Sequence, residues 1–402
     1  MLVSSGQPSL NPRLVKEADA LSDAGYTVTV LYAYWNDWGT ELDKKLLPSK
    51  KWKAQCVGGD PEQKSSLYFI SRLINKLSQS VAKKKSKTFF TEFAISRSSF
   101  FLIREAKKHN ADLYIAHNLG ALPAVVKAAK HAKAKCGFDA EDFHRQEVND
   151  DTNSFHYKLC KLIEDKYLPQ ADYITGSSPL IARQYELLYN RLVPVLSNVF
   201  PKVIPSPVVN NNKDKPLKLF WFSQTIGPSR GLELIIDAIG STKIAMELHL
   251  LGKPVDGYKG QLIQLAATAG INASMFYFYD PVPGEEIFKL APKFDIGIAS
   301  ETGFCLNNKS ALSNKLFTYL GCGLAVIASN TPAQSGLLNE YPQAGKIYND
   351  AAELTAILTQ YHQNRELLFK TKNDALTVGQ TELNWEIEGA KFLKIVADTL
   401  AN

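Results

Sequence analysis

The apolar positions in the second half of the chain change period at regular intervals. Residues 294–299 form an apolar run of strand length, and residues 316–320 then carry apolar side chains at helical spacing until Gly321 and Gly323. Residues 324–328 form a second apolar run. A buried strand, a helix stopped by glycine and another buried strand account for this order.

The polar segment before that helix contains candidate chemistry. Ser313 is a natural N-cap, and it places Asn314 and Lys315 in the first helical turn. Free N–H groups and the helix dipole attract anions there, whereas a lysine opposes the dipole. A lysine at this position therefore suits a bound phosphate, with a solvated surface lysine as the alternative.

A similar unit begins at residue 217. Residues 217–222 read as a strand and 223–228 as a loop, and Ser229 would cap a helix with Arg230 in its first turn. The apolar stripe of that helix comprises Leu232, Ile235, Ile236 and Ile239. Two cations at two helix starts can bracket a diphosphate, which predicts a nucleotide-diphosphate site.

Strand and helix patterns alternate along most of the chain, as in α/β proteins with parallel, doubly wound sheets. A helix is expected over residues 12–24, ending at Gly25. A stretch rich in Pro, Asn and Lys at 200–218 marks a domain boundary, and 402 residues exceed what one core usually serves. The expected strands lie near 1–5, 26–33, 112–116, 135–139, 172–176, 193–197, 217–222, 246–251, 275–279, 294–299 and 324–328.

Charge is unevenly distributed. The whole chain has a net charge of +6, and residues 1–198 alone have +7. The run KKKSK at 83–87 lies between apolar patches at 67–77 and 89–101. Basic residues interleaved with apolar ones suit an anionic membrane surface, although solvated helices covering a sheet give the same pattern. No recognised nucleic-acid-binding motif accompanies the charge, so nucleic acid is not expected as a partner.

The five cysteines show no metal-ligand spacing and no sign of a disulfide framework. We therefore expect no metal and no cofactor, and a cytoplasmic protein. No apolar run approaches the ~18 residues of a membrane span, and the N-terminus lacks the pattern of a signal peptide. A soluble protein, or one peripheral at the inner face of a membrane, is expected.

Three segments together carry a family resemblance: SNKLFTYLGCGLAVIAS (313–329), WFSQTIGPSRGLELIIDAI (221–239) and LYIAHNLGALPA (113–124). The chain resembles nucleotide-sugar glycosyltransferases of the GT-B fold, most nearly glycosyltransferase family 4. The resemblance implies two Rossmann-like doubly wound parallel-sheet domains facing a cleft. The acceptor-side domain would be 1–199, joined by a C-terminal helix at 385–402 that packs on it, and the donor-binding domain would be 200–384.

The resemblance also implies site residues, with a nucleotide-diphosphate sugar as co-substrate. His117 and Glu301 would be catalytic, and we expect His117 to act in turnover rather than in folding. The diphosphate would be held by Arg230, Lys315, Asn314 and Ser313, and the base and sugar would be held by Ser223, Gln224, Gly252, Asp280 and Thr318. The acceptor-side residues would be Gly6, Arg13, Asp139, Glu141 and His144.

The residues themselves leave alternatives open. His117 could be a loop histidine that bonds only to backbone, Glu301 a solvent-exposed loop residue, and Arg13 a surface helix residue. His144 lies among acidic residues, which suits either a metal or, more simply, the acceptor side or a helix cap.

The chain also departs from the family pattern. Ser223-Gln224 replaces a Gly-Arg pair, and the Glu-x7-Glu motif is missing: its second Glu, usually a ribose ligand, corresponds to Thr318 and its first lies near Ser310.

The predicted function is a glycosyltransferase, retaining by resemblance, that moves a sugar to a glycan or lipid-linked acceptor in cell-surface polysaccharide assembly. A sugar-nucleotide epimerase on a similar fold is one alternative. A catalytically silent sugar-nucleotide or glycan-binding protein is another, and the missing Glu positions favour it. A dinucleotide oxidoreductase is disfavoured because no GxGxxG follows a strand.

Overall fold

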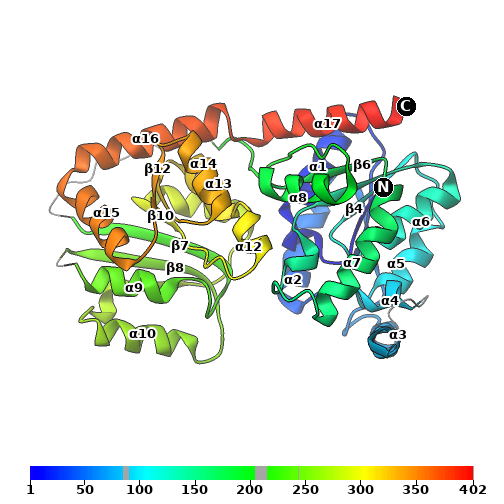
Figure 1. Ribbon diagram of the computed structural model, residues 1–402, viewed down its shortest axis with the longest axis horizontal. Coiled ribbons are helices and arrows are strands. Elements are labelled where there is room, and N and C mark those ends of the chain that lie inside the picture. The colour runs from blue at the N-terminus through cyan, green and yellow to red at the C-terminus, as the bar shows by residue number, and fades with distance from the viewer. Residues whose placement is uncertain (85–89, 204–214, 243, 402) are drawn as a thin grey trace. The chain divides into compact units, whose positions relative to one another are not determined.

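The computed structural model describes residues 1–84, 90–203, 215–242 and 244–401. The chain divides into two compact units (Figure 1). The first comprises Met1–Ser197, Cys305–Asn307 and the chain from Gly389 onward, and the second comprises Asn198–Phe304 and Asn308–Glu388. The middle of the predicted linker, 204–214, and part of the KKKSK run, 85–87, lie outside the described residues.

The first unit is built on a parallel six-stranded sheet in the order β3-β2-β1-β4-β5-β6. Its strands are β1 (Leu2–Ser4), β2 (Thr29–Ala33), β3 (Lys53–Val57), β4 (Leu113–His117), β5 (Lys135–Ala140) and β6 (Tyr173–Gly176). Its helices are α1 (Pro12–Asp23), α2 (Asp37–Leu46), α3 (Ser65–Lys84), α4 (Thr91–Ala94), α5 (Ser99–Ala106), α6 (Leu122–Ala132), α7 (Phe155–Tyr167) and α8 (Pro179–Tyr189).

The second unit has a parallel six-stranded sheet in the order β12-β11-β10-β7-β8-β9. Its strands are β7 (Leu217–Ile226), β8 (Met246–Pro254), β9 (Phe276–Tyr279), β10 (Ile296–Ala299), β11 (Ala325–Ser329) and β12 (Gly345–Tyr348). The helices that follow along the chain are α9 (Leu232–Gly240), α10 (Tyr258–Thr268), α11 (Gly284–Leu290), α12 (Leu306–Ser310), α13 (Asn314–Cys322), α14 (Pro332–Glu340), α15 (Ala351–Gln363), α16 (Arg365–Thr381) and α17 (Trp385–Ala401). Most of α17, from Gly389 onward, belongs to the first unit.

Short 3-10 turns complete the chain: η1 (Pro8–Leu10), η2 (Leu47–Ser49), η3 (His144–Gln146), η4 (Leu168–Gln170), η5 (Ala273–Met275) and η6 (Ala291–Lys293). In both sheets the chain starts at a central strand, winds outward on one side, returns to the centre and winds outward on the other. The predicted fold class, two doubly wound parallel sheets with flanking helices, is therefore confirmed.

Several boundaries follow from simple signals. Asn11 caps α1 by accepting a hydrogen bond from the N–H of Leu14, and the helix ends just before Gly25, which has a φ of +92°. Gly323, with a φ of +70°, likewise caps the end of α13. Both helices were predicted, because a side-chain cap and a left-handed glycine are readable from sequence.

Some expected elements were wrong. Residues 193–197 form no strand, and only Val195 makes an isolated bridge, to Gly176. β3 and β12 were not predicted. They are edge strands, and β3 exposes its first three residues, so neither has the apolar run of a buried parallel strand.

The last helix contributes to the core of the first unit. Phe392 and Val396 of α17 are buried with Leu2, Leu14 and Val30 in one hydrophobic cluster. Among the described residues, no helix combines the length and the apolar composition that crossing a membrane requires.

Candidate functional site

In the second sheet the order in which the strands are added reverses between β7 and β10, which are hydrogen-bonded neighbours. Open α/β sheets bind ligands at the carboxyl ends of the two strands beside such a switch point. The residues that follow β10 there are Ser300 and Glu301, and α13 starts thirteen residues beyond Glu301. The predicted diphosphate-binding and catalytic residues of this unit can be placed around this edge.

Lys315 lies in the first turn of α13, and Ser313 is the N-cap as predicted. Its Nζ is 2.7 Å from Oε1 of Glu301 and 3.1 Å from Oγ of Ser313, and it lies 5.6 Å from the Trp221 ring centroid. Lys315 is only 6% exposed. The alternative of a solvated surface lysine is therefore wrong, because this ammonium is held in a fixed place against a carboxylate.

Glu301 is equally constrained. Its Oε2 accepts a hydrogen bond of 3.0 Å from Nδ2 of Asn308, and its backbone N–H donates to Oγ of Ser329 at 2.7 Å. Burial by itself would raise the pKa of Glu301, but the ammonium of Lys315 holds that pKa below its usual value. Glu301 is therefore an ionised, mostly buried carboxylate, and the alternative of a solvent-exposed loop residue is wrong.

The loop that contains Arg230 differs from the prediction. Helix α9 begins at Leu232 with Gly231 as its N-cap residue, so Ser229 is not the cap and Arg230 precedes the first turn. Ser229 and Gly231 both have left-handed backbones, with φ values of +60° and +75°. The chain makes a tight reversal here instead of entering the helix directly, which local cap signals did not reveal.

Ser300 fixes this loop to the end of β10. Its Oγ donates to the carbonyl of Arg230 at 2.6 Å and accepts from Nε1 of Trp221 at 2.9 Å. A Cβ added to Gly231 would lie 2.9 Å from Cβ of Ser300, so the close approach requires glycine. The side chain of Arg230 is exposed, and no hydrogen bond or ion pair from it is found among the described residues. It is an available cation on a constrained backbone.

Of the residues expected to bind the base and sugar, Ser223, Gln224 and Gly252 lie on the neighbouring strands β7 and β8. β7 continues to Ile226 with a register shift between Phe222 and Thr225, so Ser223 and Gln224 lie in an irregular strand and not in a loop. Gly252 of β8 packs so closely that an added Cβ would lie 2.3 Å from the Ser223 carbonyl oxygen.

Asp280 and Thr318 differ from one another in exposure. Asp280 is exposed beyond β9, the edge strand that β8 separates from β7. Thr318 is buried within α13, with 1% of its surface exposed.

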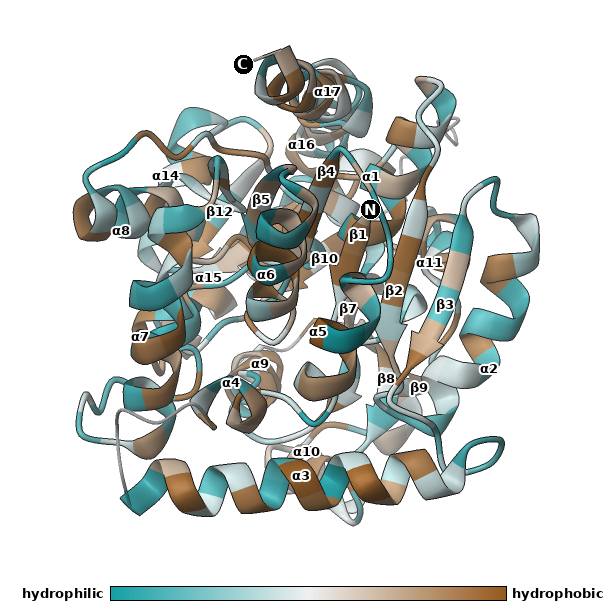
Figure 2. Ribbon diagram, turned by 90° about the vertical axis from the view of Figure 1, so that its right-hand side faces the viewer, coloured by the Kyte–Doolittle hydropathy of each residue, from teal (hydrophilic) through white to brown (hydrophobic). Residues whose placement is uncertain are grey.

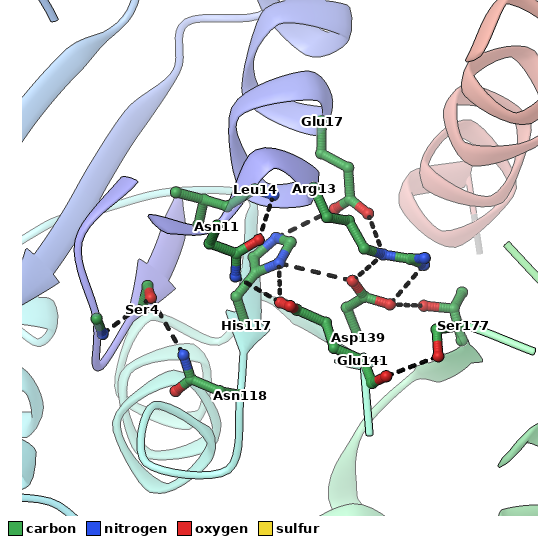
Figure 3. A network of polar contacts seen from close by, with 12 residues as sticks. Ser4, Asn11, Arg13, Leu14, Glu17, His117, Asn118, Asp139, Glu141 and Ser177 are labelled. Carbon is green, nitrogen blue, oxygen red and sulfur yellow. Dashed lines mark hydrogen bonds and ion pairs between the residues drawn. The ribbon is translucent and has the colours of Figure 1, made fainter. Parts of the chain in front are cut away.

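The first sheet has its own switch point, between β1 and β4, where Ser4 pairs with His117. Asn118 follows with a left-handed φ of +63° and joins the two loops (Figure 3). Its Nδ2 donates to Oγ of Ser4 at 3.2 Å, and its Oδ1 accepts from Oγ of Ser5 at 2.6 Å. The backbone N–H of Gly6 also donates to Oγ of Ser4, at 3.1 Å. The predicted loop after β1 is therefore anchored to the loop that follows His117.

His117 is fully buried and surrounded by carboxylates. Its Nε2 is 3.2 Å from Oε2 of Glu17, and its Nδ1 is 3.1 Å from Oε1 of Glu141 and 3.6 Å from Oδ2 of Asp139. Desolvation opposes protonation, but Glu17 and Glu141 outweigh it and raise the pKa of His117 to about 10. The ring is therefore a buried imidazolium at neutral pH, and the alternative of a loop histidine bonding only to backbone is wrong.

Arg13 completes this network from α1 (Figure 3). Its Nη2 donates to Oδ1 of Asp139 at 2.7 Å, its Nε pairs with the other oxygen, and Oε1 of Glu17 is 3.5 Å away. Thr175 donates to Oδ1 of Asp139 at 2.8 Å. Arg13 is 1% exposed, so it is not a surface helix residue.

Sequence reasoning missed Glu17. The available signal was its position four residues after Arg13 on one face of a predicted helix. Glu17, His117 and Asp139 can each offer a ligand atom, all within 4.8 Å of one another. However, the guanidinium of Arg13 already contacts both carboxylates. A metal ion could use these ligands only if Arg13 moved away.

The acidic segment after β5 serves two separate groups. Glu141 turns toward His117 and also accepts a hydrogen bond of 2.6 Å from Nδ2 of Asn11. His144 is buried in η3, where its Nδ1 lies 2.9 Å from Oε2 of Glu147. Desolvation would lower the pKa of His144, but Glu147 raises it to about 9. Of the five residues assigned to the acceptor side, three are almost wholly buried: Arg13, Asp139 and His144.

Comparison with known proteins agrees with the architecture. The family described as glycosyl transferase-like matches residues 230–381, which include Arg230, Glu301 and Lys315. The comparison with curated protein sequences gave no significant match.

Solved structures of similar fold cover essentially the whole chain. HepE from Anabaena, solved with UDP-glucose, is 14% identical, with a TM-score of 0.69 and coverage of 99% of this chain and 100% of that one. Sucrose-phosphate synthase from Thermosynechococcus elongatus is 11% identical, with a TM-score of 0.68 and coverage of 100% and 99%. WaaG, a glycosyltransferase involved in lipopolysaccharide biosynthesis, is 12% identical, with a TM-score of 0.62 and 98% coverage of both chains. The predicted resemblance to GT-B glycosyltransferases is confirmed.

Proposed function

Because the chain has the GT-B fold and its residues 230–381 match the glycosyl transferase-like family, we propose that it is a glycosyltransferase. Its donor would be a nucleotide-diphosphate sugar, and its acceptor a glycan or lipid-linked glycan in cell-surface polysaccharide assembly. One observation carries this proposal: Lys315 is fixed in the first turn of α13 at the switch point of the second sheet, paired with Glu301. Such an edge is where α/β sheets bind phosphate-containing ligands.

The diphosphate would be held by Lys315, by Ser313 and Asn314 at the start of α13, and by Arg230. Charge-assisted hydrogen bonds of this kind are about twice as strong as neutral ones. Arg230 is available because its side chain is exposed while its backbone is tied to Ser300. Ser223 and Gln224 lie in the last part of β7 and Gly252 in the last part of β8, and they would contact the base or sugar. HepE was solved in complex with UDP-glucose, which supports a uridine diphosphate sugar as the first donor to test.

The proposed reaction breaks the bond between the anomeric carbon and the oxygen of the leaving diphosphate. The acceptor hydroxyl oxygen bonds to that carbon, and its proton passes to the departing phosphate oxygen. Lys315 and Arg230 would stabilise the charge that develops on the diphosphate, and the contribution of Lys315 would be large because its charge is fixed in advance by Glu301 and Ser313. Glu301 would orient a sugar hydroxyl. Retention of configuration is part of the proposal.

The first unit suggests a division of roles. His117 is fully enclosed, so we propose that it acts in turnover as a positioning residue, by fixing Glu141 and the loop that begins at Asn118. Arg13 and Asp139 form an ion pair, which would help to keep His117 in place. Glu141 and Gly6 are partly exposed and are the better candidates for acceptor contacts.

A binding protein without catalytic activity is the second candidate, and Thr318 favours it. Thr318 stands where the family usually has a ribose-binding glutamate, and it is buried. To separate the two, the protein is incubated with UDP-, GDP- and ADP-linked sugars, and released nucleotide, transferred sugar and bound donor are measured. Nucleotide release or transfer supports the enzyme, binding without turnover supports the silent protein, and neither binding nor turnover contradicts both. Formation of an epimerised donor would instead support the epimerase.

A further inference from the structure

Helix α3 is oriented with its polar side toward the protein. Ser71, Ser78 and Ala82 are its buried residues. Nδ2 of Asn75 donates to the carbonyls of Phe93 and Ala94 at 2.7 and 3.1 Å, and Nε2 of Gln79 donates to Ala94 at 3.2 Å. The helix is therefore fixed to the first unit by hydrogen bonds and small side chains, where a surface helix normally uses its apolar stripe.

The apolar side of α3 faces outward. Phe69, Leu73 and Leu77, spaced four residues apart, are 64%, 58% and 59% exposed, and Ile70 beside them is 47% exposed. Figure 2 shows apolar and polar residues alternating along α3, which lies at the margin of the first unit. Single exposed apolar residues are common, but a continuous apolar stripe along two turns marks an interaction surface.

The charge on α3 points to the partner. Residues 65–84 contain four basic residues, Arg72, Lys76, Lys83 and Lys84, and no acidic residue. Arg72, Lys76 and Lys83 are separated by four and seven residues, so they follow one flank of the apolar stripe. An apolar face bordered by basic side chains is the pattern of helices that lie in the headgroup region of anionic membranes.

We propose that α3 is a docking surface for an anionic lipid bilayer, on which it lies in the membrane plane with Phe69, Ile70, Leu73 and Leu77 inserted. Its 20 residues correspond to about 30 Å of helix, enough for several lipid headgroups. A second copy of the chain is a poorer partner, since a symmetric contact through this face would bring two basic flanks together without any acidic residue of α3 to balance them. The surface is independent of the proposed donor site.

Co-sedimentation tests this proposal with the full chain and two sets of vesicles, one of phosphatidylcholine and one also containing phosphatidylglycerol. The wild type should bind the anionic vesicles and release as salt rises, since screening lengths fall to ~3 Å at 1 M. Arg72→Gln with Lys76→Gln should weaken binding about 30-fold, from about 1 kcal/mol per charge near the surface. Leu73→Ser with Leu77→Ser should weaken it by about tenfold or more.

The controls use the same chemistry elsewhere on the first unit. Leu187→Ser with Leu192→Ser changes two leucines that are 63% and 78% exposed, and Lys107→Gln with Lys130→Gln removes two other exposed charges. Both controls should bind like the wild type. Equal binding to the two vesicle types, no binding to either, or equal losses in test and control variants would overturn the proposal. So would a dimer in sedimentation velocity that Leu73→Ser with Leu77→Ser dissociates. Nucleotide binding, measured in parallel, should not change in any variant.

Discussion

Lys315 and Glu301 form an ion pair of 2.7 Å at the switch point of the second sheet, within a site where the chain would also bind a diphosphate. Without ligand, the carboxylate neutralises the ammonium. A bound diphosphate would therefore interact with Lys315 while Glu301 also does. Substituting Lys315 and substituting Glu301 should change nucleotide affinity in opposite directions.

For this pair we predict opposite changes in nucleotide affinity. Lys315→Ala should weaken binding of a nucleoside diphosphate by about 1.5 to 3 kcal/mol, the range for a hydrogen bond to a charged group. Glu301→Gln removes a negative charge beside the phosphates, so nucleoside diphosphate affinity should stay the same or rise while sugar transfer falls. Isothermal titration calorimetry and a transfer assay measure the two quantities. If Glu301→Gln weakened binding as much as Lys315→Ala, the shared-lysine arrangement would be wrong.

Arg230 should behave differently from Lys315, because its side chain has no partner to lose among the described residues. Arg230→Ala should leave the thermal unfolding temperature unchanged but weaken nucleoside diphosphate binding by about 1.5 to 3 kcal/mol. Lys370→Ala, which removes another exposed cation of the same unit, is the control and should have no effect on binding. Wild-type affinity in Arg230→Ala would remove this residue from the proposed site.

The helix starts show what sequence can and cannot predict about this site. Ser313 caps α13 through its own side chain, a local interaction that residue type reveals, and the prediction was confirmed. Ser229 has the same residue type, but α9 starts after a left-handed reversal held by Ser300, a residue about 70 positions away. That contact depends on the sheet bringing β7 and β10 together, which no local signal encodes.

In the first unit, the burial of His117 and Arg13 likewise depends on residues that are distant in the sequence. Sequence placed His117 at a strand end, which is correct, and we inferred that it would act without a role in folding. The structure surrounds it with carboxylates from α1, about 100 residues away, and from the segment after β5, 24 residues away. Arg13 was readable as a cation on a helix, but only the folded sheet supplies Asp139 as its partner. The positions of His117 and Arg13 on their strand and helix could be predicted from the sequence. The network of buried ion pairs that they form could not.

The burial of His117 revises the expected effect of removing it. His117→Ala would remove the buried imidazolium that lies against Glu17 and Glu141, and breaking a buried charge pair typically costs about 3 to 5 kcal/mol. Unfolding measurements should therefore show a clear loss of stability. His117→Asn retains a hydrogen-bond donor and should lose less stability. If His117 positions the loop for turnover, this variant should still lose about 10²-fold in turnover with nucleotide affinity unchanged. Full activity in His117→Asn would assign the residue to stability alone.

The last prediction concerns pH. In the native protein the pKa of His117 is raised to about 10, while an unfolded histidine titrates near 6.5. Its stabilising contribution is therefore fully present below about pH 6.5 and is lost as the pH rises toward about 10. The stability difference between wild type and His117→Asn, obtained from denaturant unfolding, should be largest near pH 6 and shrink steadily toward pH 10. Asp139, whose pKa is raised to about 6 mainly by burial, changes stability only at lower pH, between about 4 and 6. His131→Asn, at an exposed position of α6, is the control and should show no such trend. A difference that stayed constant from pH 6 to pH 10 would mean that His117 is not a buried imidazolium.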